Sequence, residues 1–394
     1  MKIFADLHIH SRYSKGTSKK ITLKNLEDSV LKKGIGLLGT GDFTHPRWLK
    51  ELSNLKEEKG LLKTNDEFYF VLQTEVNLVF NKGGKLRKIH LLLLSPSLNC
   101  SKRIASFFSL YCNIEADGRP TINLDAERFV KEMKKIDEAM EIIPAHIWTP
   151  WFGLFGSKSG FDSIEECFGS MTEYIHALET GLSSDPEMNW KISALDRYEL
   201  VSFSDAHSYW PHRLGREATL FDLEEKSYDS LIKAIKEKKV VLTLEVDPAY
   251  GKYHFDGHRK CNFSCSYERT KELDGICPIC HRPLTIGVLN RVEELSDRDN
   301  GKPEHSHPFV KSLPLAEIIA FHKGKGVMTK SVIDDYEFLI RNLGNEYNIL
   351  LFEDIKKIES IAGKGIAQLI QAQRSDRLMI KPGYDGEYGK IIKD

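Results

Sequence analysis

The chain has 394 residues, 41% of them hydrophobic, and a formal net charge of −1. This length suggests two or three domains, and the composition excludes a disordered chain. No apolar run approaches the roughly 20 residues that a membrane-spanning helix needs, and the polar N-terminus is unlike a signal peptide. We therefore expect a soluble, cytoplasmic protein with no membrane partner. The balance of 56 basic against 57 acidic residues argues mildly against a nucleic-acid binder, although basic residues can cluster locally.

Short apolar runs alternate with amphipathic stretches from residue 1 to about residue 246. Residues 21–33, 124–139 and 228–238 have the apolar stripe of a surface helix. Strands that alternate with helices indicate βα units and a parallel sheet. The pattern predicts an α/β fold with a closed or nearly closed barrel, and a doubly wound open sheet is the alternative. The expected strands are residues 2–8, 35–41, 68–75, 88–95, 141–146, 173–179 and 199–205.

The character of the sequence changes near residue 247. The segment 247–259 is rich in glycine, histidine and aromatic residues, a cysteine cluster follows it, and helical patterns return from residue 315. We therefore expect a catalytic barrel over residues 1–246, a zinc-binding module over 247–310, and a mainly helical, helix-hairpin-helix-like domain over 311–394.

Side chains that can bind a metal stand at the ends of several expected strands. His8 and His10 alternate with apolar residues, so both face one side of the first strand. The carboxyl ends of parallel barrel strands meet at one rim, and a mixed nitrogen and oxygen ligand set suits Zn²⁺, Mn²⁺ or Fe²⁺ better than Mg²⁺. The alternative is a set of unrelated polar groups in the core and rim. The further candidates are Asp42, Glu75, His90, His146, Asp205 and His207.

The motifs DLHIHSRYS, GTGD, TEV, PAH and SDAH resemble those of the polymerase-and-histidinol-phosphatase (PHP) superfamily. The resemblance covers about residues 1–246 and implies a distorted (β/α)7 barrel with two or three divalent ions (zinc, manganese or magnesium). It implies one ion at His8, His10, Glu75 and Asp205, a second at Glu75, His90 and His146, and a third near Asp42 and His207. Phe43 departs from the family pattern, which has a histidine there, and His45 is a candidate replacement.

Bridged cations suit the hydrolysis of a phosphodiester, because they neutralise its charge and lower the pKa of a bound water from 15.7 to about 7. No serine or cysteine nucleophile is required, and the sequence shows no convincing triad. Glu75 and Asp205 are therefore the expected catalytic ligands. Arg213 is a candidate for stabilising the phosphate, with a structural salt bridge as the alternative.

Four of the seven cysteines lie within residues 261–280, as Cys261-x3-Cys265 and Cys277-x2-Cys280. Such paired spacing predicts a closed, tetrahedral and structural zinc site rather than a disulfide framework. Redox use of the second pair is the alternative. Three nearby histidines can replace a ligand, although surface or phosphate-contact roles are favoured for them: His254, His258 and His281.

Two further segments have the composition of a DNA contact. Trp148, Trp151 and Phe152 follow His146 and can stack on an extruded base, or they can form an apolar lid. Gly363 and Gly365 stand in a Gly-x-Gly turn whose backbone N–H groups can bind a phosphate, or which merely needs glycine.

The segments KYHFDGHRKC, CPICHRPLTIGVLNRVEELSDR, ALETGLSSDPEMNW and KPGYDGEYG resemble the endonuclease Q family over nearly the whole chain. This resemblance implies cleavage of a DNA strand 5′ to a deaminated base, such as uracil, hypoxanthine or xanthine, or to an abasic site. The alternatives are a small-molecule phosphatase of the histidinol-phosphatase kind and a non-catalytic nucleic-acid-binding module.

Overall fold

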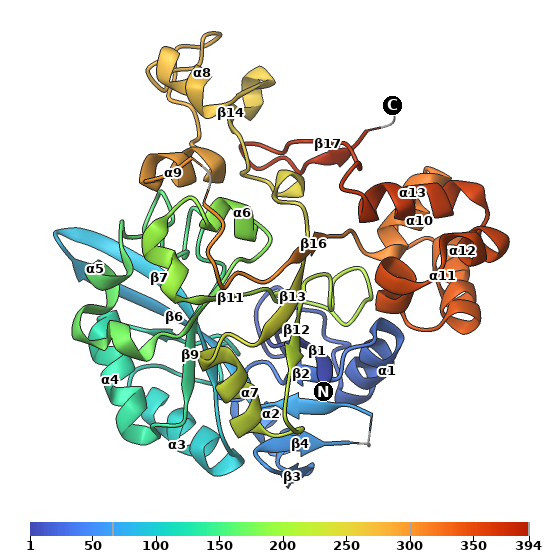
Figure 1. Ribbon diagram of the computed structural model, residues 1–394. Helices are drawn as coiled ribbons and strands as arrows, with labels where there is room; N and C mark the ends of the chain where they lie inside the picture. The colour runs from blue at the N-terminus through green and yellow to red at the C-terminus, as the bar shows by residue number, and fades with distance from the viewer. Residues whose placement is uncertain (65–66, 300, 393–394) are drawn as a thin grey trace.

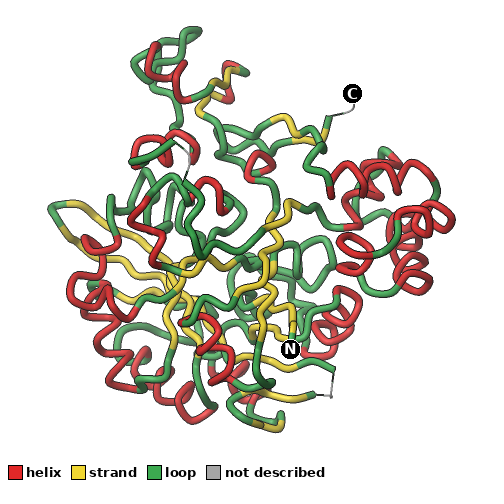
Figure 2. The backbone as a smooth tube through the Cα atoms, in the orientation of Figure 1, coloured by secondary structure: helices red, strands yellow, loops and turns green. Residues whose placement is uncertain are grey.

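The computed structural model describes residues 1–64, 67–299 and 301–392. Figure 1 shows a mixed α/β body that carries the N-terminus, a small lobe that projects from one end of it, and a helical part at its side. In Figure 2 the strands run through the interior of the body and most of its helices lie on the outside. Among the described residues, no helix combines the length and the apolar character needed to span a membrane.

The strands of the body form open sheets. The largest has the order β16 (Phe309–Lys311), β13 (Val240–Glu245), β12 (Ala218–Asp222), β1 (Lys2–Asp6), β2 (Leu37–Gly39), β5 (Tyr69–Val71), β4 (Leu61–Lys63) and β3 (Lys56–Glu58). A second sheet contains β8 (Thr121–Ile122), β6 (Gln73–Lys82), β7 (Lys85–Leu94) and β9 (Glu141–Pro144). The smaller pairs are β10 (Ala177–Glu179) with β11 (Glu199–Val201), β14 (Asp256–His258) with β15 (Phe263–Cys265), and β17 (Ile380–Lys381) with β18 (Lys390–Ile391).

Strand direction departs from the expected all-parallel arrangement. The pairs β1–β2, β2–β5 and β10–β11 are parallel as predicted, but β6, β7 and β9 are antiparallel neighbours. Gly83 and Gly84 connect β6 to β7 with φ angles of 60° and 71°, the backbone of a two-residue hairpin turn. The apolar run in β7 reflects side chains that are buried on both faces of the sheet. Such burial does not determine the direction of the neighbouring strands. The prediction of a parallel sheet throughout is therefore wrong.

Isolated contacts bring the separate sheets together at the strand ends. Ile147 beyond β9 donates its N–H to the carbonyl of Glu179 on β10, at 3.1 Å. Ile9 beyond β1 forms a parallel bridge with Ala206 beyond β11. The ends of strands from all three sheets of the body thus lie next to one another.

The three helices predicted in the body are present, each behind a side-chain cap. Thr22, Asp125 and Ser227 accept backbone N–H groups at the starts of α1 (Leu23–Lys33), α4 (Ala126–Ile136) and α7 (Tyr228–Lys236), which satisfies donors that the first turn leaves free. The other helices of the body and lobe are α2 (Pro46–Leu52), α3 (Leu98–Phe108), α5 (Ile164–Phe168), α6 (Pro186–Asn189), α8 (Tyr267–Glu272) and α9 (Val288–Leu295).

The helical part has an apolar core of its own, built around Ile319, Leu339 and Ile370. A buried ion pair attaches it to the body: Lys33 Nζ of α1 lies 2.7 Å from Glu346 Oε1, and both side chains are at most 1% exposed. Its helices are α10 (Leu315–Lys323), α11 (Lys330–Leu343), α12 (Ile355–Ala362) and α13 (Lys364–Arg374).

Candidate metal centre

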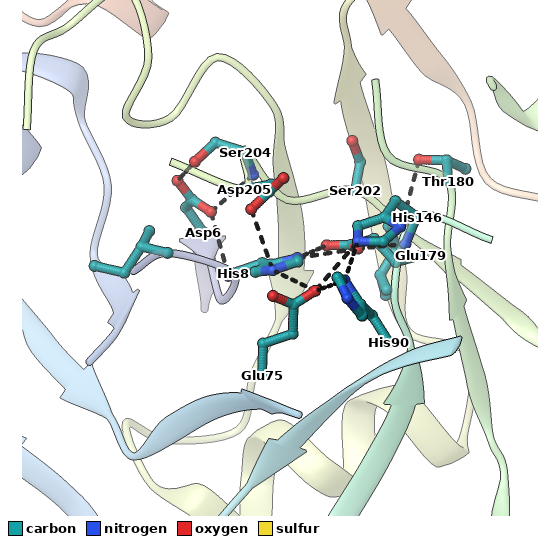
Figure 3. A network of polar contacts seen from close by, with 12 residues as sticks. Asp6, His8, Glu75, His90, His146, Glu179, Thr180, Ser202, Ser204 and Asp205 are labelled. Atoms are coloured by element: carbon teal, nitrogen blue, oxygen red, sulfur yellow. Dashed lines mark hydrogen bonds and ion pairs between the residues drawn. The ribbon is translucent and has the colours of Figure 1, made fainter. Parts of the chain in front are cut away.

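Two groups of potential ligand atoms come together in the body, within 4.8 Å of one another in each group. His8, His10, His146 and Asp205 lie beyond strand ends, but Glu75 stands near the start of β6 and His90 inside β7, so the prediction that Glu75 ends a strand is wrong. The first consists of His8, His10, Glu75 and Asp205, and the second of Glu75, His90 and His146. Figure 3 shows His8, Glu75, His90, His146 and Asp205 pointing toward one another from different segments of the body. The structure therefore brings together the residues that the PHP resemblance implies for two ions, with Glu75 in both groups.

Glu75 is the centre of the cluster. Its carboxylate is fully buried, with Oε1 2.6 Å from His90 Nδ1 and Oε2 3.2 Å from His10 Nε2. Burial favours the neutral acid, but the charge of Arg119 and hydrogen bonds from His10 and His146 outweigh it and hold the pKa of Glu75 well below its usual range. Burial also lowers the pKa of His90 to about 4. A carboxylate beside a neutral imidazole is the state in which both groups bind metal.

The His8 ring is held from behind by Glu179. Its Nδ1 lies 2.9 Å and 3.1 Å from the two Glu179 oxygens, and the same carboxylate accepts the backbone N–H of His146 at 2.6 Å. His8 Nε2 is buried and has no hydrogen-bond partner, and it points toward Asp205 Oδ1 at 3.5 Å and Glu75 Oε1 at 3.6 Å. An orphaned ring nitrogen aimed at two carboxylates fits a divalent cation, and Glu179 is the usual kind of partner behind a histidine ligand.

Asp42, His207 and His45 lie outside both groups. Asp42 Oδ1 is 3.1 Å from His10 Nδ1, and its other oxygen accepts the Ser11 backbone N–H at 2.6 Å, so Asp42 orients His10 as Glu179 orients His8. The His207 ring is 4.5 Å from the His10 ring, at the edge of the cluster. His45 stacks on a tyrosine ring at 4.3 Å. The third ion stays a prediction.

Three site residues have strained backbones. Asp42, His146 and Asp205 have φ angles of 44°, 31° and 47°, in the left-handed region that non-glycine residues rarely adopt. Such strain persists only where the surrounding structure enforces it, and it is frequent at functional sites.

The arginine at this cluster is not the one that the sequence suggested. Arg119 Nη1 lies 3.0 Å from Glu75 Oε2, a contact that no motif indicated. Arg213 instead lines a cavity beside Tyr250 and Glu317, between the end of β13 and α10. The neighbours of Arg213 come from the body, the start of the lobe and α10, and its role in stabilising the reacting phosphate stays a prediction.

The aromatic segment after His146 is only partly accessible. Trp148 is 1% exposed and its Nε1 donates to Asn189 Oδ1 at 2.8 Å, so the expected contact of Trp148 with DNA is wrong. Trp151 is 42% exposed and packs edge-on against Tyr253 of the lobe, at 5.5 Å between ring centroids. Phe152 stacks on the His90 ring at 4.6 Å. An apolar cluster and an exposed aromatic surface are thus both present.

The cysteine site has a different fourth member from the one expected. The potential ligand atoms of His258, Cys261, Cys277 and Cys280 lie together, with His258 Nδ1 3.1 Å from Cys261 Sγ. Cys265 Sγ is instead 3.3 Å from Thr270 Oγ1. His258 and Cys265 share one face of the β14–β15 hairpin, and the register places His258 nearer the turn that carries Cys261. The structure thus groups three cysteines with one histidine, in place of the four cysteines predicted, and the binding of zinc here stays a prediction.

The Gly-x-Gly turn joins α12 to α13. Gly363 has a φ of 83° and is the only residue between the two helices. A Cβ at Gly365 would lie 2.2 Å from the His322 ring of α10, so a larger residue there would have to displace that side chain. Binding of DNA by the turn stays a prediction.

Similarity to known proteins covers almost the whole chain. The crystal structure of a lesion-specific endonuclease Q from Pyrococcus furiosus superimposes with a TM-score of 0.89 at 36% identity, over 99% of this chain and 95% of that one. The chain belongs to the endonuclease Q family. An endonuclease Q complex with a 27-mer duplex that has an abasic lesion at the active site matches at the same TM-score and identity, over 99% of this chain and 96% of that one. Endonuclease Q proteins are DNA-cleaving hydrolases.

Two further matches concern parts of the chain. Residues 314–377 match the family described as the MJ0043 C-terminal domain. The uncharacterised protein MJ0043 of Methanocaldococcus jannaschii is 39% identical over 249 residues, which are 62% of this chain and 31% of that protein. This endonuclease Q family member thus spans about a third of the length of that relative.

Proposed function

We propose that this endonuclease Q family member hydrolyses the phosphodiester 5′ to a deaminated base, such as uracil, hypoxanthine or xanthine, or to an abasic site in DNA. The observation that carries the proposal is the cluster of His8, His10, Glu75 and Asp205 in a chain that resembles lesion-bound endonuclease Q over 99% of its length.

In this proposal, the two ligand groups hold divalent ions (zinc, manganese or magnesium), with Glu75 shared and a third ion near Asp42 and His207. Such ions supply charge neutralisation and an activated water for phosphodiester hydrolysis. The linked strand ends around the cluster act as the rim of a distorted (β/α)7 barrel over residues 1–246. The lobe over 247–310 and the helical domain over 311–394 extend the surface that contacts DNA.

The chain's own residues provide orientation at this site. Glu179 and Asp42 fix the His8 and His10 rings so that the opposite nitrogens face the cluster. Buried partners of this kind prevent the rings from rotating when ligands bind or leave. Asp205 lies beside both histidines, and together with Glu75 it supplies the negative charge of the site.

The proposed recognition of damaged DNA relies on an exposed aromatic side chain and on backbone N–H groups. Trp151 is exposed next to the Phe152–His90 stack, where an aromatic ring can stack on an extruded base or fill the gap that it leaves. Gly363 is the N-cap residue of α13. The free backbone N–H groups at the start of a helix can bind a DNA phosphate.

The lobe serves a structural role in the proposal. Zinc bound by Cys261, Cys277, Cys280 and His258 would close a tetrahedral site with no position for substrate. The lobe has only a small apolar cluster, which includes the cysteines themselves, so the ion would supply much of its folding energy.

Cleavage of matched oligonucleotides tests the proposal. Duplexes with a single uracil, hypoxanthine or abasic site, and an undamaged control, are incubated with protein and Mn²⁺ or Mg²⁺. We expect one nick 5′ to the lesion, an intact control, and no cleavage by Glu75→Gln even though it binds the duplex. Equal cleavage of undamaged DNA, or turnover of phosphomonoesters alone, would contradict the proposal, and the second result would indicate a small-molecule phosphatase.

A further inference from the structure

Arg119 reaches the centre of the ligand cluster from its outer edge. Its Nη1 is 3.0 Å from Glu75 Oε2, and its side chain is 28% exposed while that of Glu75 is fully buried. A partly exposed arginine thus contacts a carboxylate of the cluster that has no solvent exposure of its own.

The position of Arg119 is set by contacts on both sides of it. Gly118 donates its N–H to the Tyr13 carbonyl at 3.2 Å, and the Pro120 carbonyl accepts the Asn77 N–H at 3.0 Å, two residues beyond Glu75 on β6. A Cβ at Gly118 would lie 2.5 Å from Asp42 Oδ2. Only glycine permits this approach, so the loop is fitted to the cluster.

Burial opposes the charge of Arg119, but the carboxylates of Glu75, Asp205 and Asp117 stabilise it and raise its pKa. Metal bound to the same carboxylates would change that balance. Divalent cations at the cluster would occupy the Glu75 oxygens and repel a guanidinium at this distance. A cation next to a metal site is stabilised when an anion lies between them, and the planar guanidinium fork matches two oxygens of a phosphate. A lysine would supply the charge but not the paired donors.

We infer that Arg119 is a catalytic residue that donates hydrogen bonds to non-bridging oxygens of the scissile phosphate and stabilises the charge that develops on them during cleavage. The inference rests on the proposed function. Arg119 neither gives nor takes a proton, because the oxygens that it binds stay on phosphorus. The competing interpretation is a salt bridge that merely neutralises Glu75.

The test compares Arg119→Ala, Arg119→Lys and a matched control, Arg12→Ala. Arg12 is also 28% exposed, but its Nη2 pairs with Glu51 at 2.6 Å and not with a ligand. The measurements are bound metal, the single-turnover rate on an abasic duplex, and the affinity of the Mn²⁺-loaded protein for inorganic phosphate. Removing one transition-state donor costs about 10²- to 10³-fold in rate, so we expect that loss in Arg119→Ala and a smaller one in Arg119→Lys.

Phosphate affinity and metal content separate the two interpretations. We expect phosphate affinity to fall about tenfold in Arg119→Ala, as for a lost charged hydrogen bond, with metal content as in Arg12→Ala. A rate restored at full metal occupancy, or unchanged phosphate affinity, would overturn the inference. An inactive wild-type protein would refute the proposed function instead, and the phosphate titration would still test Arg119.

Discussion

The carboxylate behind His8 permits a quantitative test of the metal centre. Glu179 is fully buried and binds both the His8 ring and the His146 backbone N–H. Glu179→Gln keeps the volume but removes the charge that holds the His8 ring with Nε2 toward the cluster. Loss of such a partner typically lowers metal affinity 10- to 100-fold, which corresponds to about 1.4–2.8 kcal/mol of binding free energy.

The chain supplies a matched control in Glu141→Gln. Glu141 is also fully buried and lies 2.9 Å and 3.1 Å from His176 Nδ1, the same geometry as in the Glu179–His8 pair, but at the opposite end of its strand from His146. Titration of Mn²⁺ into both variants, followed by calorimetry, measures the difference. Equal Mn²⁺ affinities in Glu179→Gln and Glu141→Gln would refute the orienting role of Glu179.

Three further outcomes are expected. Cys265→Ser should retain one zinc per chain, whereas Cys277→Ser should lose it; loss of zinc in both variants, by metal analysis, would restore the four-cysteine assignment. Trp151→Ala should weaken binding of lesion-containing duplexes by about 1–3 kcal/mol in fluorescence anisotropy, and unchanged affinity would remove Trp151 from the DNA surface. Burial raises the pKa of Glu245 from 4.5 to about 7, so the folded protein keeps a proton that the unfolded chain releases. The contribution of Glu245 to the free energy of unfolding is therefore fully present below pH 4.5. As the pH rises toward 7, the free energy of unfolding falls by on the order of 3 kcal/mol. Urea denaturation should show a smaller decrease in Glu245→Gln than in wild type, and equal decreases would contradict the assignment.

Most side chains of the cluster could be predicted from the sequence because their signal is local. His8 and His10 alternate with apolar residues just beyond β1, and His146 and Asp205 follow the ends of β9 and β11, whereas Glu75 stands near the start of β6. Strand periodicity places His8 and His10 on one face, and the convergence of strand ends fits His146 and Asp205. The positions of Glu75 and His90 depend on the antiparallel β6–β7 hairpin, which the strand pattern did not predict, and these two residues were selected correctly through the PHP resemblance.

The residues that support the ligands could not be predicted in this way. Arg119 belongs to no motif, and Glu179 ends the expected strand 173–179 but was not selected as a site residue. Their roles depend on which strand end or loop packs behind or above the cluster. The choice of His258 over Cys265 depends on the register of one short hairpin. The burial of Trp148 depends on its partner Asn189, 41 residues further along the chain. Each is a tertiary contact, and spacing along the chain contains no information about it.

Anomalous diffraction from crystals grown with Mn²⁺ tests the metal centre most directly. The account predicts strong manganese peaks within bonding distance of His8 Nε2 and of the Glu75 carboxylate, and their absence from crystals of Glu75→Gln. Crystals with no peak between these side chains at saturating Mn²⁺ would contradict the proposed metal site and the hydrolytic function that rests on it.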